Sequence, residues 1–243
     1  MRYIKVRLDQ LMNKKGLTSS RSRAYELIKK GFVKVNQKIC KKPAKEVKED
    51  EDITILSNDA WVGRGARKLS FALNFFNIQI KGKTALDVGS STGGFTQVLL
   101  KKGASEITAV DVGSNQLDSG LRRSPKIISM EKTDIRSLKK DFDLYFDLVV
   151  VDVSFISISK VIDHIDRVTK SPGEIVILFK PQFEVGKENL TKNGIVRDRQ
   201  ISVDTLSNFI SGLDQTCLEY QSTVDSEVKG KNGNQEIFIY LKK

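Results

Sequence analysis

ALDVGSSTGGFTQVLL, residues 85–100, is the stretch that decides the fold: an apolar run reaches Asp87, and Gly89, Gly93 and Gly94 then fall within six residues. A strand that leads through a glycine-rich turn into a helix is typical of open parallel sheets, which bind ligands beyond the carboxyl ends of their strands. The spacing is not the Gly-x-Gly-x-x-Gly of a dinucleotide site, and the turn after the strand contains no Gly-Lys-Ser/Thr for a triphosphate. The stretch therefore predicts a nucleotide-like ligand other than NAD or ATP.

The sequence on either side continues this alternation of strands and helices. Helical patterns occur at residues 95–103, 158–168 and 199–213, between or after strand-like runs at 84–88, 106–112, 126–131, 146–155 and 173–180. The pattern predicts an α/β fold with a mainly parallel, doubly wound, Rossmann-like sheet. Residues 217–224 and 235–243 are two further strands joined by a Gly/Asn-rich turn without a helix, so we expect the last strand to run antiparallel.

An acidic residue accompanies each of the first three strands. Asp87 opens the glycine turn, where a carboxylate attracts the ammonium and sulfonium of S-adenosylmethionine and repels a pyrophosphate. Asp111 lies 22 residues after Gly89, about the separation at which an acid accepts both ribose hydroxyls. Asp134 could contact the adenine amino group, with Ile135 against the ring. Any one acid could be only a helix cap or a turn former, but three in strand order indicate a Rossmann-like methyltransferase. The predicted cofactor-binding residues are Asp87, Gly89, Ser90, Ser91, Gly93, Gly94, Phe95, Asp111, Val112, Asp134, Ile135 and Asp152.

Methyl transfer to a hydroxyl needs a base beside the sulfonium, and four ionisable residues are expected at that edge of the sheet. Asp152 ends the fourth strand and Lys180 the fifth, while Glu236 begins the antiparallel last strand and so lies at the same edge. Lys68 is about 100° of helix from Leu69, at the rim of an apolar helix face. We predict that Lys180 is the base and that Lys68, Asp152 and Glu236 orient it and the substrate.

Several of these residues could instead have a purely structural role. Lys68 could be an ordinary solvated lysine, and Glu236 a cross-strand partner. Phe155, Phe179 and Phe183 either stack a base near the site or belong to the core.

The basic character of the chain is concentrated at its N-terminus. Residues 1–45 contain fourteen Lys or Arg and two acids, a balance of +12 against +11 for the whole chain, so the remaining residues carry −1. Such an excess on a short folded segment indicates a nucleic-acid partner. Helical patterns over residues 7–15 and from a cap at Thr18 or Ser19 to Gly31 precede a strand, an Asn-Gln turn and a strand that ends near residue 56.

RLDQLMNKKGLTSSRSRAYELIKKGFVKVNQKI, residues 7–39, resembles the small α+β RNA-binding domain first seen in the fourth protein of the ribosomal small subunit. The resemblance covers roughly residues 5–56. It implies that the second helix and the following turn face RNA; the alternative is a solvated basic helix face. The RNA-binding residues that it implies are Arg21, Arg23, Lys29, Lys30 and Lys34.

The sequence also predicts how the chain is divided and where it works. We expect an RNA-binding domain over residues 1–58, a linker anchored by Trp61 over 59–63, and a catalytic domain over 64–243. The two cysteines match no metal or redox spacing, so we expect a reduced, cytoplasmic protein without a metal. No apolar run approaches the roughly 18 residues of a membrane span. A monomer is favoured.

Six motifs carry a resemblance that extends over nearly the whole chain: GRGARKL, LDVGSSTGGFTQVLL, AVDVGSNQLDSGLR, DVSFIS, FKPQFE and GNQEIFIYL. Together with the basic N-terminal domain they are similar to the TlyA family, which joins that RNA-binding domain to an FtsJ-like methyltransferase domain. The resemblance implies S-adenosylmethionine-dependent 2′-O-methylation of cytidine in ribosomal RNA. The family's Lys-Asp-Lys-Glu tetrad falls on Lys68, Asp152, Lys180 and Glu236. Ala66 and Arg67 depart from the family pattern, and the short termini are similar to the members that act on the large subunit only.

Two rival functions follow from the same sequence. The family is also labelled as haemolysin, but neither a spanning segment nor a long amphipathic basic helix is present for a membrane-lytic protein. A catalytically inert RNA-binding assembly factor would not need the Lys-Asp-Lys-Glu tetrad. An active ribosomal RNA methyltransferase, bound to ribosomal RNA or ribosomal subunits, is the predicted function.

Overall fold

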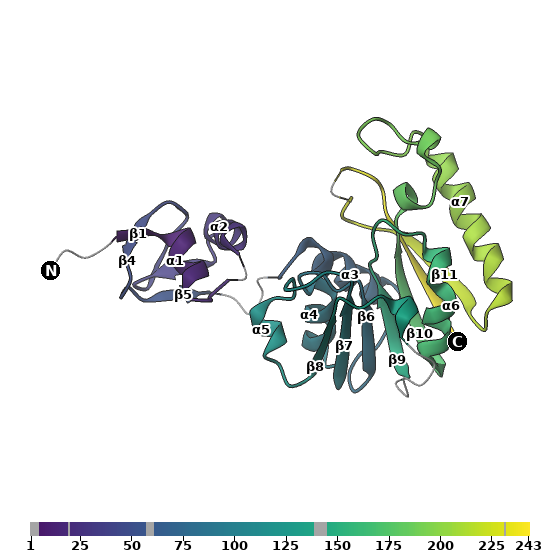
Figure 1. Ribbon diagram of the computed structural model, residues 1–243, viewed down its shortest axis with the longest axis horizontal. Helices are drawn as coiled ribbons and strands as arrows, with labels where there is room; N and C mark the ends of the chain where they lie inside the picture. The colour runs from purple at the N-terminus through teal and green to yellow at the C-terminus, as the bar shows by residue number, and fades with distance from the viewer. Residues whose placement is uncertain (1–4, 19, 57–60, 139–144, 231) are drawn as a thin grey trace.

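The computed structural model describes residues 5–18, 20–56, 61–138, 145–230 and 232–243. Figure 1 shows a small N-terminal lobe and a larger lobe built on one sheet. Residues 59–60 of the predicted linker and Ser19, one of the two predicted cap residues, lie outside the described residues.

The N-terminal lobe packs two helices against two small sheets. Leu8, Leu11, Met12 and Ile28 from its helices are fully buried in its own core. Two very short strands, β1 and β4, pair with each other and were not expected from the sequence. The elements are β1 (Lys5–Arg7), α1 (Leu8–Lys14), α2 (Arg21–Lys29), β2 (Val33–Val35), β3 (Lys38–Ile39), β4 (Glu46–Lys48) and β5 (Ile53–Ile55).

The start of α2 corrects one prediction. Ser20, rather than Thr18 or Ser19, is the N-cap: its backbone is extended, and its side chain accepts a hydrogen bond from the Arg23 N–H at 3.1 Å. A cap must stand directly before the first helical residue to reach that N–H, and Arg21 is that residue. The predicted Asn-Gln turn is confirmed, because Asn36 and Gln37 both have positive φ between β2 and β3.

The larger lobe is built on a seven-stranded sheet in the order β11-β12-β10-β9-β6-β7-β8. The expected doubly wound α/β sheet is confirmed, and β12 is antiparallel to both of its neighbours, β10 and β11. The register pairs Phe179 with Ile237, so the start of β12 lies at the edge where β10 ends. The strands are β6 (Thr84–Val88), β7 (Glu106–Asp111), β8 (Ile127–Glu131), β9 (Phe146–Val151), β10 (Thr169–Phe179), β11 (Glu219–Asp225) and β12 (Ile237–Lys242).

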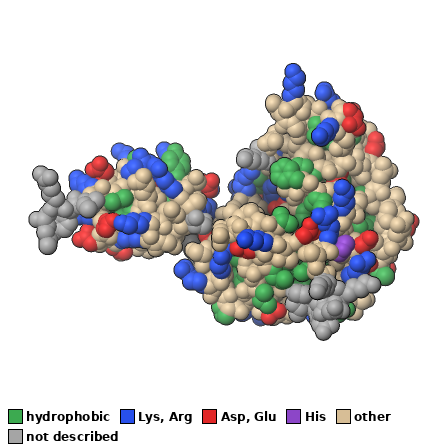
Figure 2. Space-filling view, viewed as in Figure 1, with side chains coloured by type: hydrophobic (Ala, Val, Ile, Leu, Met, Phe, Trp, Pro, Cys, Tyr) green, Lys and Arg blue, Asp and Glu red, His purple; other side chains and the backbone are tan. Residues whose placement is uncertain are grey.

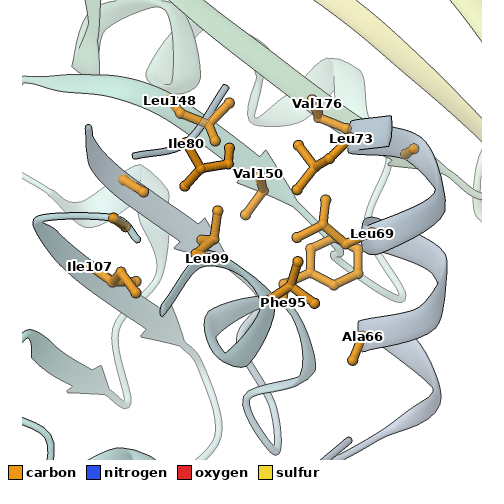
Figure 3. Close-up of a cluster of buried hydrophobic side chains, with 14 of the residues drawn as sticks. Ala66, Leu69, Leu73, Ile80, Phe95, Leu99, Ile107, Leu148, Val150 and Val176 are labelled. Atoms are coloured by element: carbon orange, nitrogen blue, oxygen red, sulfur yellow. The ribbon is translucent and has the colours of Figure 1, made fainter. Parts of the chain in front are cut away.

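Helices cover both faces of this sheet because alternate strand residues point to opposite sides. Leu148 and Val150 of β9 join one core with Leu69 and Leu73, whereas the intervening Val149 joins a second core on the opposite face. Figure 3 shows the first core between the sheet and two helices. Burial of each leucine contributes roughly 1.5–3 kcal/mol. The helices are α3 (Arg64–Phe75), α4 (Gly94–Lys101) and α5 (Ser119–Arg122) on the first face, and α6 (Ile162–Val168) and α7 (Arg199–Ser211) on the second.

Short 3₁₀ helices shape the loops between these elements, and the sequence patterns did not predict them. They are η1 (Ile135–Ser137), η2 (Ile158–Lys160), η3 (Pro181–Phe183), η4 (Lys187–Asn189) and η5 (Gly212–Gln215). Over the described residues, no helix combines the length and the apolar character needed to span a bilayer.

Candidate active site

Two neighbouring cavities lie along the carboxyl edge of the sheet. The larger has a volume of about 1050 Å³ and the smaller about 710 Å³. Both are lined by the glycine turn and by the loop after β9. The residues common to both linings are Gly89, Ser91, Asp152, Ser154, Phe155, Gln182, Phe183 and Leu190. The two cavities therefore lie side by side at the glycine turn.

The glycine turn needs its glycines for separate reasons. Gly89 has a φ of +85°, and a Cβ there would lie 2.6 Å from the Asp152 carbonyl oxygen. Gly93, the cap of α4, has a φ of +92°, and its Cβ would meet the Leu117 and Leu121 side chains. These two positions therefore tolerate no other residue without strain. Gly93 lines neither cavity, unlike the other predicted turn residues Gly89, Ser90, Ser91, Gly94 and Phe95.

The larger cavity has an apolar floor with carboxylates at its rim. Asp111 is held by the backbone, since its two oxygens accept from Ser91 N–H and Gly113 N–H, each at 2.7 Å. Asp134 binds Arg136, and this hydrogen bond holds the pKa of the Asp134 carboxyl below its usual range. Four further residues supply apolar surface, among them the two predicted from the sequence: Val88, Val110, Val112 and Ile135.

Asp87 is not where the sequence analysis expected it. Its side chain is fully buried and lines neither cavity. One carboxylate oxygen accepts from Thr96 Oγ1 at 2.5 Å, and the other has no hydrogen-bond partner. Burial raises the pKa of Asp87 to about 7. The structure thus places the Asp87 side chain away from both cavities, because a strand residue two positions before the turn points into the core rather than beyond the edge of the sheet.

The four predicted catalytic residues line one cavity, the smaller one. Lys180 Nζ lies 2.7 Å from Asp152 Oδ1 and also donates to Ser154 Oγ at 2.7 Å. Lys68 and Glu236 form a second ion pair, and both residues are buried. Lys68 is thus not a solvated lysine, and the partner of Glu236 comes from α3 rather than from a neighbouring strand.

Ser154 and two aromatic residues also line this cavity. Ser154 was not predicted from the sequence, although its place two residues after Asp152 puts it in the same loop. Phe155 is 91% exposed, and its ring centroid lies 5.0 Å from that of Phe183. Phe155 and Phe183 line both cavities. Phe179 is instead buried in the core, which was the alternative to base stacking given for it.

The residues predicted to face RNA divide into two groups. Arg21 binds the buried carboxylate of Asp9 at 3.1 Å, and Arg23 donates to the Trp61 carbonyl. Lys29 and Lys30 are exposed, and Lys34 is half-buried. Figure 2 shows Lys and Arg side chains on the visible face of the N-terminal lobe, with acidic ones among them. The lysines thus present charge to solvent, whereas the arginines also have structural contacts. Arg21 stabilises the lobe, and Arg23 binds the segment that connects it to the larger lobe.

Comparisons with known proteins agree with this architecture. The family described as S4 domain matches residues 6–53, and the family described as FtsJ-like methyltransferase matches residues 61–243. A 16S/23S rRNA (cytidine-2′-O)-methyltransferase TlyA of Mycobacterium tuberculosis is 37% identical, with 98% of this chain and 90% of that protein covered. A 23S rRNA (cytidine-2′-O)-methyltransferase TlyA of Campylobacter jejuni is 38% identical, with 97% and 98% covered.

A solved structure described as a hemolysin from Streptococcus thermophilus is 33% identical, with a TM-score of 0.74 over 98% of this chain and 88% of that chain. The same two-part architecture therefore occurs in relatives under both names. This chain belongs to the TlyA family, with an S4 domain followed by an FtsJ-like methyltransferase domain.

Proposed function

We propose that this protein transfers the methyl group of S-adenosylmethionine to the ribose 2′-hydroxyl of a cytidine in large-subunit ribosomal RNA. The observation that carries the proposal is the smaller cavity, in which two lysine–carboxylate pairs stand beside the glycine turn. The names of the two TlyA relatives support ribosomal RNA and cytidine as the target. The large subunit is common to both names, and the S4 match supports RNA binding.

The residues at the larger cavity suit S-adenosylmethionine. Carboxylates of Asp111 and Asp134 are acceptors for ribose hydroxyls and an adenine amino group, and Val112 and Ile135 offer apolar surface to a ring. Gly89 lines both cavities, and its lack of a side chain lets the turn pack directly against the Asp152 backbone. When bound, the cofactor supplies an electrophilic methyl group on a sulfonium.

Lys180 is the proposed base. Its amine is fixed from two sides, by Asp152 Oδ1 and by Ser154 Oγ, so it cannot swing away when a ribose enters the cavity. In this role its neutral amine accepts the proton of the 2′-hydroxyl, while the bound cofactor would supply the methyl group and leave as S-adenosylhomocysteine. General base catalysis of this kind contributes about 10²–10⁴-fold to a rate.

Lys68 and Glu236 are proposed to orient the ribose. Their pair is buried at the wall of the same cavity, where each charge is compensated by the other. A buried charge left without its partner costs about 3–5 kcal/mol, so the pair is held firmly in place. The aromatic pair Phe155 and Phe183 is placed to take the base of the same nucleotide by stacking.

The test is methyl transfer from tritiated S-adenosylmethionine to ribosomal subunits purified from cells that lack the protein. The wild type should label large-subunit RNA at a 2′-hydroxyl, and Lys180→Ala should lose this transfer by at least about 100-fold. Cofactor binding, measured by calorimetry, should persist in Lys180→Ala. Lys126→Ala, at an exposed lysine away from the cavities, is the matched control.

Three outcomes would refute the proposal. Label on a base or a protein would contradict the reaction class. Full RNA binding with no transfer by the wild type would favour the inert assembly factor. Erythrocyte lysis that Lys180→Ala retains, without any transfer, would favour the membrane-lytic alternative.

A further inference from the structure

Helix α3 carries two phenylalanines on the side turned away from the core. Arg67, Phe71 and Phe75 follow each other at intervals of four residues, so they lie within about 80° of one another around the helix axis. Phe75 is 57% exposed, whereas Leu69 and Leu73 on the opposite side are buried. The solvent side of an amphipathic helix normally presents polar residues. Exposed aromatic surface here therefore indicates a contact with something else.

These side chains line a hollow of about 510 Å³, and their rings are held in place. The Phe71 and Phe75 ring centroids are 6.1 Å apart. Phe75 meets Phe76 edge-on at 5.4 Å, and Phe76 stacks on Tyr240 of β12 at 5.3 Å. A ladder of rings anchored in the sheet gives a rigid platform, which costs little entropy when a ligand binds. The hollow is lined by Trp61, Arg67, Ser70, Phe71, Asn74, Phe75 and Glu227.

The charge around the platform is mostly positive. Arg67 lines the hollow, Lys102 donates to Asn74 at 2.8 Å, and Glu227 is the one acid in the described lining. Arg64, one turn before Arg67, lines the smaller catalytic cavity. Helix α3 thus carries one arginine at the proposed ribose site and another at the aromatic hollow.

We propose that this surface, the α3 face (Arg64, Arg67, Phe71, Asn74 and Phe75), binds unpaired nucleotides that flank the methylated ribose. Bases stack on Phe71 and Phe75, and the phosphates between them meet the two arginines. Aromatic side chains interleaved with cations are the physical requirement for single-stranded RNA, and stacking of this kind tolerates any base. The inference rests on the proposed function, because it assumes that the RNA enters the cavity at Arg64.

The sole tryptophan of the chain, Trp61, lies in the hollow and reports on it. The full-length protein is titrated with an unstructured oligocytidine of about 12 nucleotides, within the usual site size for such surfaces. A stacked base should quench Trp61 fluorescence. Phe75→Ala should weaken this binding about tenfold, and Arg67→Gln should reduce the slope of log K against log salt by about 0.7, the loss of one phosphate contact to a single strand.

Controls separate this surface from the fold and from catalysis. Tyr145→Ala removes a comparably exposed aromatic directly before β9 that does not line the hollow, and it should bind like the wild type. Phe75→Ala should keep the cofactor affinity and melting temperature, because Phe75 is outside the core. In the transfer assay it should raise the KM for ribosomal RNA while kcat stays within about twofold.

The outcomes distinguish the two proposals. If the wild type methylates RNA but Phe75→Ala changes neither oligocytidine binding nor the KM, the α3 face is not an RNA surface and the proposed function stands. If oligocytidine binds the α3 face but no RNA is ever methylated, the surface stands and the proposed function fails. Sedimentation that shows a dimer which Phe75→Ala dissociates would assign the face to a second copy and overturn the inference.

Discussion

At the scale of single residues, Asp87 is the carboxylate whose surroundings differ most from solution. Burial is the main cause of its raised pKa of about 7, and the Thr96 hydroxyl offsets part of that effect. The folded state therefore holds a proton between about pH 4 and 7 that the unfolded chain has released. Stability from this residue is present below pH 4 and falls as the pH rises toward 7.

Asp87→Asn tests this linkage, because asparagine has nearly the same shape and no charge. At pH 8 the variant should be more stable than the wild type by up to roughly 4 kcal/mol, since a shift of one unit corresponds to about 1.4 kcal/mol. The gain should vanish near pH 4. Urea unfolding at several pH values measures it, with the exposed Asp214→Asn as control. An identical pH dependence in Asp87→Asn and the wild type would contradict the argument.

Comparing Gly89 with Gly82 separates two reasons for a glycine: the left-handed backbone conformation and the lack of space for a side chain. Both have φ above +80°, but a Cβ at Gly82 would meet nothing within 4 Å, whereas at Gly89 it would lie 2.6 Å from a backbone oxygen. Gly82→Ala should cost about 1–2 kcal/mol, the price of the left-handed conformation. Gly89→Ala should cost at least about 2 kcal/mol more and should also lose cofactor affinity. If both variants lose the same free energy of unfolding in denaturant, the turn can move to accommodate the added methyl group and the steric argument fails.

At the scale of elements, the loop after β9 is held at both ends. Asp152 N–H donates to Val88 at its start, and the carboxylate of Glu184 accepts from Ser157 Oγ at 2.6 Å and from Ile158 N–H at 2.9 Å at its end. Between these anchors, Phe155 adopts a φ of +64°, a strained conformation for an aromatic residue. Glu184 follows η3, the segment after Lys180, so it joins the two loops that meet in the cavity.

Glu184→Ala should therefore release the loop that carries Asp152 and Ser154. We expect kcat to fall about tenfold with little change in cofactor affinity, because a partly buried N–H and hydroxyl lose their acceptor, which costs about 1–3 kcal/mol. Glu184→Gln keeps an acceptor and should recover most of the rate, and Glu188→Ala, an exposed glutamate on η4, should have no effect. Loss of stability without any change in kcat would show that Glu184 only supports the fold.

At the scale of the whole molecule, charge and chemistry are divided between the two lobes. The N-terminal 45 residues carry +12 and the rest of the chain −1. Asp9 shows that part of the basic excess is structural, since the hydrogen bond from Arg7 lowers the pKa of its buried carboxyl and Arg21 adds to that effect. The exposed lysines at the end of α2 are the ones that we predict to contact RNA.

The double substitution Lys29→Gln, Lys30→Gln should weaken binding to ribosomal RNA and reduce its salt dependence by up to about two phosphate contacts. Cofactor affinity should stay unchanged, because neither lysine lines a cavity. Filter binding at several salt concentrations measures the effect, with Lys126→Gln in the other lobe as control. An unchanged salt slope would show that RNA contacts other residues.

The sequence by itself determined the alternation of strands and helices, the antiparallel last strand and the list of residues gathered at one edge of the sheet. These features depend on residues that are close together in the sequence, because hydrophobic periodicity, glycine spacing and the lengths of the connections can be read from short segments. The resemblance of six motifs to the TlyA family was equally local.

Only the tertiary structure decided which of those residues meet and in what surroundings. It paired Lys68 with Glu236 and Lys180 with Asp152, added Ser154 and Glu184, and withdrew Asp87 into the interior. Residues 68 and 236 are remote in the chain, and their contact depends on how α3 lies against β12. Side-chain direction at the end of a strand and the packing of one element on another are set by the whole fold, so no local pattern could supply them.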